Sequence, residues 1–134
     1  MIIRKLFIMA LKRCFLLLMF GGIFYLSNQP SLKILPPLFP YQDKVFHIGA
    51  FFLLSVSMIV NRDLYRGGHP AIFLLSIGVV YAVSDEFHQS FVPGRDCSAG
   101  DLIADIAGLA IGLLSYFIYL RVHLKKNRER ENSS

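Results

Sequence analysis

Four long apolar stretches constrain the fold of this chain more than any other feature of its sequence. They cover residues 14–26, 45–60, 71–83 and 102–120, and the third continues into a more polar run over 84–91. A membrane-spanning helix needs about 20 residues, with about 17 as the lower limit. Only the fourth stretch reaches that length alone, so the other three must include polar ends. Because lipid cannot satisfy polar groups, we expect those ends to be buried in protein or wetted.

The composition also favours a membrane protein over a soluble domain. Apolar residues make up 54% of the 134 residues, and the mean hydropathy of +0.52 is high for a soluble domain of this size. The sequence therefore predicts an all-α membrane protein, a small bundle of four transmembrane helices. The expected division is a basic N-terminal segment (1–13), the four-helix domain (14–120) and a basic tail (121–134).

The positions of the basic residues predict the orientation of this bundle. Eleven Lys and Arg residues lie at the N-terminal end, in the loop before residue 71 and in the C-terminal tail. The other two loops hold three, which are Lys33, Lys44 and Arg95. Because basic loops stay on the cytoplasmic side, both termini are predicted to be cytoplasmic, in a bacterial cytoplasmic membrane. A cleaved signal peptide is the main alternative for the first stretch, but residues 25–29 lack a small-x-small cleavage site.

The same charges indicate the kind of partner. The net charge is +5, yet the basic residues flank apolar segments and no nucleic-acid recognition motif accompanies them. The expected partners are therefore the lipid bilayer and anionic lipid head groups or cell-wall precursors, and not nucleic acid. A homo-oligomer or a membrane partner protein is left open. Cys14 and Cys97 are expected at opposite ends of the bundle, where they cannot form a disulfide.

Polar residues recur at the predicted outer end of each of the last three helices. Asp43 and His47 are four residues apart, so they share one helix face, as do Asp101 and Asp105. On the third helix Asp85 and Gln89 have the same spacing. Since these faces should point into the bundle, the sequence predicts a small polar pocket that opens outward above apolar side chains. On the fourth helix Gly108 and Gly112 continue the polar face and would let another helix approach closely.

Several of these residues have simpler explanations. Helix capping alone could explain Asp43, and Ser98 with Asp101 forms an S-x-x-D capping pattern. His47 could be a packing residue that donates a hydrogen bond to a backbone carbonyl. Asp85 and Glu86 are harder to explain, because a carboxylate near hydrocarbon and near a helix C-terminus is disfavoured twice. A carboxyl group in such a place is a candidate general acid or base.

These polar groups form a recognisable set of short motifs. The set comprises Ser27-Asn28-Gln29-Pro30, Asp43-Lys44 with His47, Asp85-Glu86 with His88-Gln89, Pro93-Gly94-Arg95, and Ser98 with Asp101 and Gly108. With these motifs the chain resembles the VanZ-like family, named for a teicoplanin-resistance protein, from about residue 15 to residue 120. The resemblance implies a small polytopic membrane protein and, for one member, a link to glycopeptide tolerance, but no agreed reaction. Ala107 stands where the family pattern suggests a polar Asn, and Asp105 is the nearest substitute.

Three functions are open at this point. In the first, the pocket binds or processes an envelope component, a lipid head group or a cell-wall precursor, with an effect on glycopeptide tolerance. In the second, an enzyme acts on a lipid-linked or phosphorylated substrate by general acid/base chemistry. In the third, the chain is a structural or accessory membrane subunit.

The candidate residues divide by role. The candidate catalytic residues are Glu86, His88, Asp85 and His47. The candidate binding residues are Arg95, Lys44, Asp43, Gln89, Gln29, Asp101 and Asp105, with Arg95 and Lys44 on an anionic group. The cofactor is unknown and no metal ligand is assigned. A divalent metal held by residues from the set Asp43, His47, Asp85, Glu86 and His88 is left open, although the spacing matches no known zinc motif.

Overall fold

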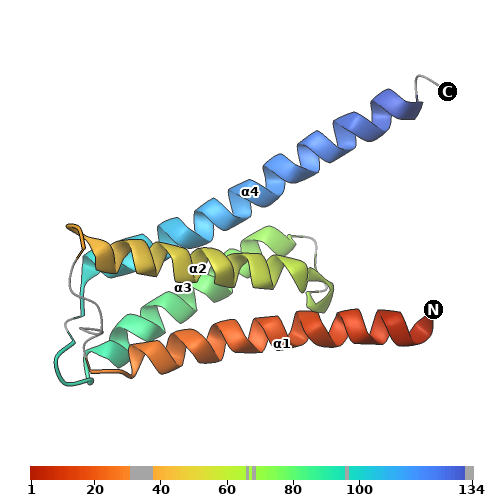
Figure 1. Cartoon of the computed structure of the whole chain (residues 1–134). Helices are drawn as coiled ribbons and strands as arrows, with labels where there is room; N and C mark the ends of the chain where they lie inside the picture. The colour runs from red at the N-terminus through yellow and green to blue at the C-terminus, as the bar shows by residue number, and fades with distance from the viewer. Residues whose placement is uncertain (31–37, 66, 68, 96, 132–134) are drawn as a thin grey trace.

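The computed structural model describes residues 1–30, 38–65, 67, 69–95 and 97–131. It contains helices α1 (Ile2–Ser27), α2 (Gln42–Val60), α3 (Pro70–Gln89) and α4 (Ala99–Glu131), with a short 3-10 helix η1 (Arg62–Leu64) after α2 (Figure 1). Each of the four α-helices is long and apolar enough to cross a membrane. The predicted fold class is thus confirmed, and the chain is a multi-pass membrane protein. Lys33 and Arg66, which entered the charge count, lie outside the described residues.

Two helices extend beyond the apolar stretches. Helix α1 begins at Ile2 rather than near residue 14, and α4 continues to Glu131, well past residue 120. The added residues include many Lys and Arg, which have high helix propensity. The final part of α4 leaves the bundle and projects away from it (Figure 1). Helix α3 includes the polar run through Gln89, so Asp85 and Glu86 are helical residues.

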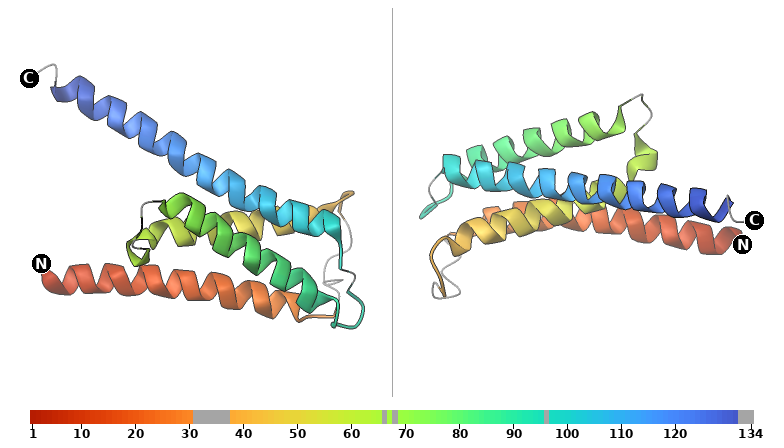
Figure 2. Two further views of the ribbon diagram at one scale, coloured as in Figure 1. Left: turned by 180° about the vertical axis from the view of Figure 1, so that it is seen from behind. Right: turned by 90° about the horizontal axis from the view of Figure 1, so that it is seen from above.

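The four helices run alternately up and down. Figures 1 and 2 show both chain termini at the same end of the molecule, with the connection from α2 to α3 also at that end. The other two connections lie at the opposite end. This arrangement agrees with a common side for both termini, while the assignment of that side to the cytoplasm stays a prediction. Cys14 and Cys97 are both unpaired, as expected.

Helices α2 and α4 form the most extensive helix pair in the bundle. A Cβ atom added at Gly108 would lie 2.4 Å from the backbone oxygen of Ile48, and one added at Gly112 would lie 2.6 Å from Cβ of Ser55. Only glycine permits so close an approach. The prediction that these two glycines face a neighbouring helix is therefore confirmed, and the neighbour is α2.

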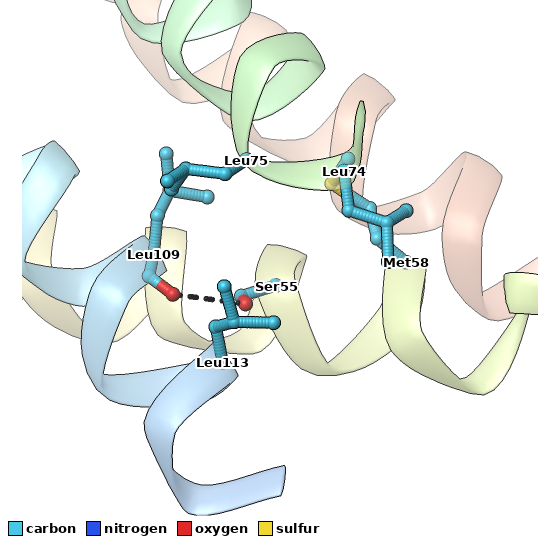
Figure 3. Close-up of a pocket in the computed structure, with 6 residues that line it drawn as sticks. All are labelled: Ser55, Met58, Leu74, Leu75, Leu109 and Leu113. Carbon is cyan, nitrogen blue, oxygen red and sulfur yellow. Dashed lines mark hydrogen bonds between the residues drawn. The ribbon is translucent and has the colours of Figure 1, made fainter. Parts of the chain in front are cut away.

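The middle of the bundle is apolar and closely packed. Figure 3 shows Leu74 and Leu75 of α3 above Met58 of α2 and Leu109 of α4, around a cavity of only about 10 Å³. The Ser55 hydroxyl donates to the Leu109 carbonyl at 3.1 Å, so the polar atom here is satisfied. This apolar layer separates the polar groups at the two ends of the bundle.

Candidate functional site

Among the residues that the structure describes, five carboxylates lie at the end of the bundle where α1 and α3 finish and α2 and α4 begin. They are Asp43, Asp85, Glu86, Asp101 and Asp105, and we call this region the acidic end. The alternating helix directions bring the C-terminal turn of α3 beside the N-terminal turns of α2 and α4. Residues far apart in the sequence therefore meet there.

Asp85 joins α3 to the last residue of α1. Its Oδ2 atom accepts hydrogen bonds from the Ser27 hydroxyl at 2.8 Å and from Nε2 of Gln89 at 2.9 Å. Only 4% of Asp85 is exposed. Both donors are neutral, and Asp85 forms no ion pair within the described part of the chain. A buried carboxylate with neutral partners alone keeps an unbalanced charge.

Glu86 caps the neighbouring helix α4. Its Oε2 atom accepts the backbone N–H of Ser98 at 2.9 Å, and the Ser98 hydroxyl accepts the N–H of Gly100 at 3.2 Å. The Ser98 part of the predicted capping pattern is confirmed. The carboxylate that returns to Ser98 comes from α3, however, and not from Asp101. The other oxygen of Glu86, Oε1, is buried and has no hydrogen-bond partner within the described part of the chain.

His47 of α2 pairs with Asp105 of α4. The distance between Nδ1 of His47 and Oδ1 of Asp105 is 2.8 Å, and Asp105 is completely buried. Its second oxygen, Oδ2, has no hydrogen-bond partner among the described residues. Glu86 lies close by, because His47, Glu86 and Asp105 each offer a ligand atom within 4.8 Å of the others.

Lys44 and Arg95, the Lys and Arg side chains that the structure describes at this end, are already engaged. Lys44 contacts Asp101 at 2.6 Å and Asp43 at 3.2 Å. Arg95 donates through Nη2 to the Leu26 carbonyl at 2.8 Å and through Nε to the Gln29 carbonyl at 3.1 Å. Arg95 thus satisfies carbonyl groups at the C-terminal end of α1, where a cation is favoured by the helix dipole. Both side chains thus already have partners within the protein, which an anionic ligand would have to replace.

Two of the predicted residues point elsewhere. His88 lies 3.3 Å from Oδ1 of Asn28 and packs on the ring of Phe24, with 4.9 Å between ring centroids. It therefore contacts α1 rather than the buried carboxylates of Glu86 and Asp105. The Gln29 side chain, two residues beyond α1, donates to the Tyr25 carbonyl of that helix at 3.1 Å.

A cavity of about 60 Å³ lies between α1, α2 and α3 at the acidic end. Its polar lining residues are Ser27, His47, Asp85, Gln89 and Arg95. Its apolar lining residues are Ile23, Leu26, Phe46, Ala50 and Phe51. Such a volume holds a few water-sized groups, so it fits a small polar group rather than a whole head group.

Sequence reasoning missed a second polar group at the other end of the bundle. Arg13 of α1 hydrogen-bonds to Asn61 and Asp63, and Arg62 hydrogen-bonds to Tyr116 of α4. We call these five residues the paired end. The Arg13 guanidinium holds the pKa of Asp63 below its ordinary value of 3.8. The available signal in the sequence was Asp63, a single acid among the basic residues that follow the apolar stretch 45–60.

Comparisons with known proteins agree with this architecture. A family model described as VanZ/LLP1 matches residues 12–120. An uncharacterized protein of Schizosaccharomyces pombe is 33% identical over 104 residues, which are 78% of this chain and 61% of that relative. The chain thus spans about three fifths of the length of this curated relative. No solved structure gives a significant match.

Proposed function

The chain belongs to the VanZ/LLP1 family, and from that premise we propose that it binds the small polar part of an envelope component in the cavity at the acidic end. The distribution of basic residues supports a bacterial cytoplasmic membrane with both termini in the cytoplasm. In that orientation the acidic end belongs to the outer face of the membrane.

The burial of the Asp85 carboxylate among neutral hydrogen-bond donors is the observation that carries this proposal. Asp85 lines the cavity, is buried and has only neutral hydrogen-bond donors. Arg95, which lines the same cavity, is engaged by carbonyl groups of α1. Because Asp85 is buried and Arg95 is partly exposed to solvent, a cation is a better occupant than an anion. The chemical group that fits the cavity is a protonated amine, which is small and offers several donors to Asp85.

Two envelope components could supply an amine, an aminophospholipid head group and the peptide part of a cell-wall precursor. A relative occurs in a yeast, and phospholipid head groups are the envelope components that yeast and bacteria share. This favours the lipid. An effect on glycopeptide tolerance would then follow from a change in the outer leaflet or its precursors.

Native mass spectrometry of the detergent-purified full chain tests the proposal. We expect phosphatidylethanolamine to bind more tightly than phosphatidylglycerol, which lacks the amine. Asp85→Asn keeps an acceptor for Ser27 and removes the charge, so affinity for phosphatidylethanolamine should fall about tenfold or more. Asp63→Asn, at the paired end, is the matched control and should bind normally. Equal binding of both lipids, or normal binding by Asp85→Asn, would contradict the proposal.

A cellular assay separates the proposed role from a structural one. Membrane abundance and teicoplanin susceptibility are measured for the same two variants in a bacterial host that lacks the native gene. Normal abundance with altered susceptibility in Asp85→Asn alone would support a binding role. Reduced abundance alone would favour the structural or accessory subunit.

General acid/base catalysis is the second candidate, and the His47–Asp105 pair favours it. A His oriented by a buried carboxylate, beside a second carboxylate from Glu86, is an arrangement that can transfer protons. Turnover of aminophospholipid or lipid-linked phosphate by the purified chain, abolished in His47→Asn, would establish it. If neither substrate class yields product, a binding role without catalysis is favoured.

A further inference from the structure

We propose that His47, Glu86 and Asp105 form a binding site for one divalent transition-metal ion, with Zn²⁺ as the best fit. The three residues come from α2, α3 and α4, so an ion would join the three helices that form the apolar layer. The inference does not depend on the proposed function, because Asp85 is not among the ligands.

The chemistry of the three side chains suits such an ion. Imidazole nitrogen and carboxylate oxygen are the ligands that Zn²⁺ and Mn²⁺ accept, while Mg²⁺ and Ca²⁺ prefer oxygen alone. The ligand atoms lie within 4.8 Å of one another. Bonds of about 2.1 Å at the tetrahedral angle place two ligands about 3.4 Å apart, so separations of up to 4.8 Å must shorten by at most about 1.4 Å to close the site.

Two unpartnered oxygens provide the independent observation. Oε1 of Glu86 and Oδ2 of Asp105 are buried without a hydrogen-bond partner in residues 1–30, 38–65, 67, 69–95 and 97–131, and the two residues are 4% and 0% exposed. Buried polar atoms in proteins are nearly always satisfied, and a charged one without a partner is strongly disfavoured. A cation between these two oxygens would satisfy both at once.

The remaining contacts hold the ligands in place for this role. Oε2 of Glu86 accepts the Ser98 N–H, and Oδ1 of Asp105 lies 2.8 Å from Nδ1 of His47. The Ser98 contact fixes Glu86 through one oxygen, as outer contacts do in known metal sites, and the His47–Asp105 contact already places these two ligands side by side. Lys44, a cation of the same end, is engaged by Asp101 and Asp43 instead.

This ligand set differs from the one that the sequence left open. Only His47 and Glu86 are common to both. Asp43 pairs with Lys44, Asp85 binds Ser27 and Gln89, and His88 contacts α1. Asp105 takes their place because α4 approaches α2 closely beside Gly108. Three protein ligands would leave at least one coordination position for water or a bound ligand.

The test uses the full chain in detergent, freed of metal by a chelator and then titrated with ZnCl₂, MnCl₂ or MgCl₂. Calorimetry should show one Zn²⁺ per chain, weaker Mn²⁺ and no Mg²⁺ binding, and Zn²⁺ should raise the unfolding temperature. Glu86→Gln and Asp105→Asn should each weaken Zn²⁺ binding at least tenfold. X-ray absorption of the loaded protein should show nitrogen and oxygen ligands without sulfur.

The control variants distinguish loss of this site from a general loss of negative charge at the acidic end. Asp43→Asn removes an exposed acid of the same end, and Asp85→Asn removes the residue behind the proposed function, so both should keep full Zn²⁺ affinity. Glu86→Gln retains the acceptor for the Ser98 N–H. If circular dichroism shows that Asp105→Asn fails to fold, the Zn²⁺ affinity of Glu86→Gln is the deciding measurement. Absence of Zn²⁺ binding by the wild type, or unchanged affinity in Glu86→Gln, would overturn the inference.

Discussion

The acidic end and the paired end hold their charges in opposite ways. At the paired end Asp63 is half exposed, and the Arg13 guanidinium contacts it directly. At the acidic end Asp85 and Glu86 are almost completely buried, and neither forms an ion pair among the residues that the structure describes. The two ends belong to the same four helices, so helix composition alone does not account for the contrast.

The difference separates charges that are paired within the protein from charges that a ligand could use. A half-exposed pair contributes little and is easily replaced. Buried carboxylates without cations oppose folding, and proteins keep such groups mainly where a ligand, a proton or an ion uses them. The acidic end is therefore where the chemistry of this protein should be sought, and the paired end is an internal control for every measurement.

The largest expected effect comes from separating α2 and α4. In Gly108→Ala the new Cβ would meet the Ile48 backbone, which cannot move aside as a side chain can. We expect destabilisation of about 3 kcal/mol or more, at the upper end for overpacking, and loss of the His47–Asp105 pair one turn away. Thermal unfolding in detergent measures this loss of stability. Gly49→Ala on α2, where nothing lies within 4 Å of the added atom, is the control; equal losses in both variants would refute the explanation.

A smaller effect should follow from loss of the α4 cap. Ser98→Ala removes the hydroxyl that accepts the Gly100 N–H, and an N-cap serine contributes about 1 kcal/mol. Ser115→Ala in the same helix is the matched control, because its hydroxyl only bonds to the carbonyl of Ile111 one turn earlier. Denaturant unfolding of the two variants should differ by about that amount. If they are equally stable, Glu86 alone holds this helix end.

The smallest effect concerns pH at the paired end. Arg13 lowers the pKa of Asp63 in the folded chain, so their interaction contributes fully above the ordinary pKa of 3.8 and is lost as pH falls through the lower folded value. The difference in unfolding temperature between wild type and Asp63→Asn should be small and constant from pH 8 to about pH 5. Below about pH 4 it should shrink. A difference that grows on acidification would contradict the sign of this linkage.

The sequence alone determined the four spans, their alternation and the end at which the carboxylates gather. These properties depend on local features, namely the length of apolar runs, helical spacing and the position of turn residues. The glycine face of α4 was predictable for the same reason, since Gly108 and Gly112 lie one turn apart on one side of a helix. Even Ser98 at the start of α4 followed from a local capping pattern.

Only the tertiary structure decided which polar side chains meet. The rotation of each helix about its axis is set by packing against its neighbours, here by the fit of Gly108 and Gly112 against α2. That rotation places His47 on Asp105, 58 residues away, and turns His88 toward α1. It also engages Lys44 and Arg95 with protein atoms, which changes the expected ligand from an anion to a cation. Spacing along one helix gives the face that residues share, but not the neighbour that this face meets.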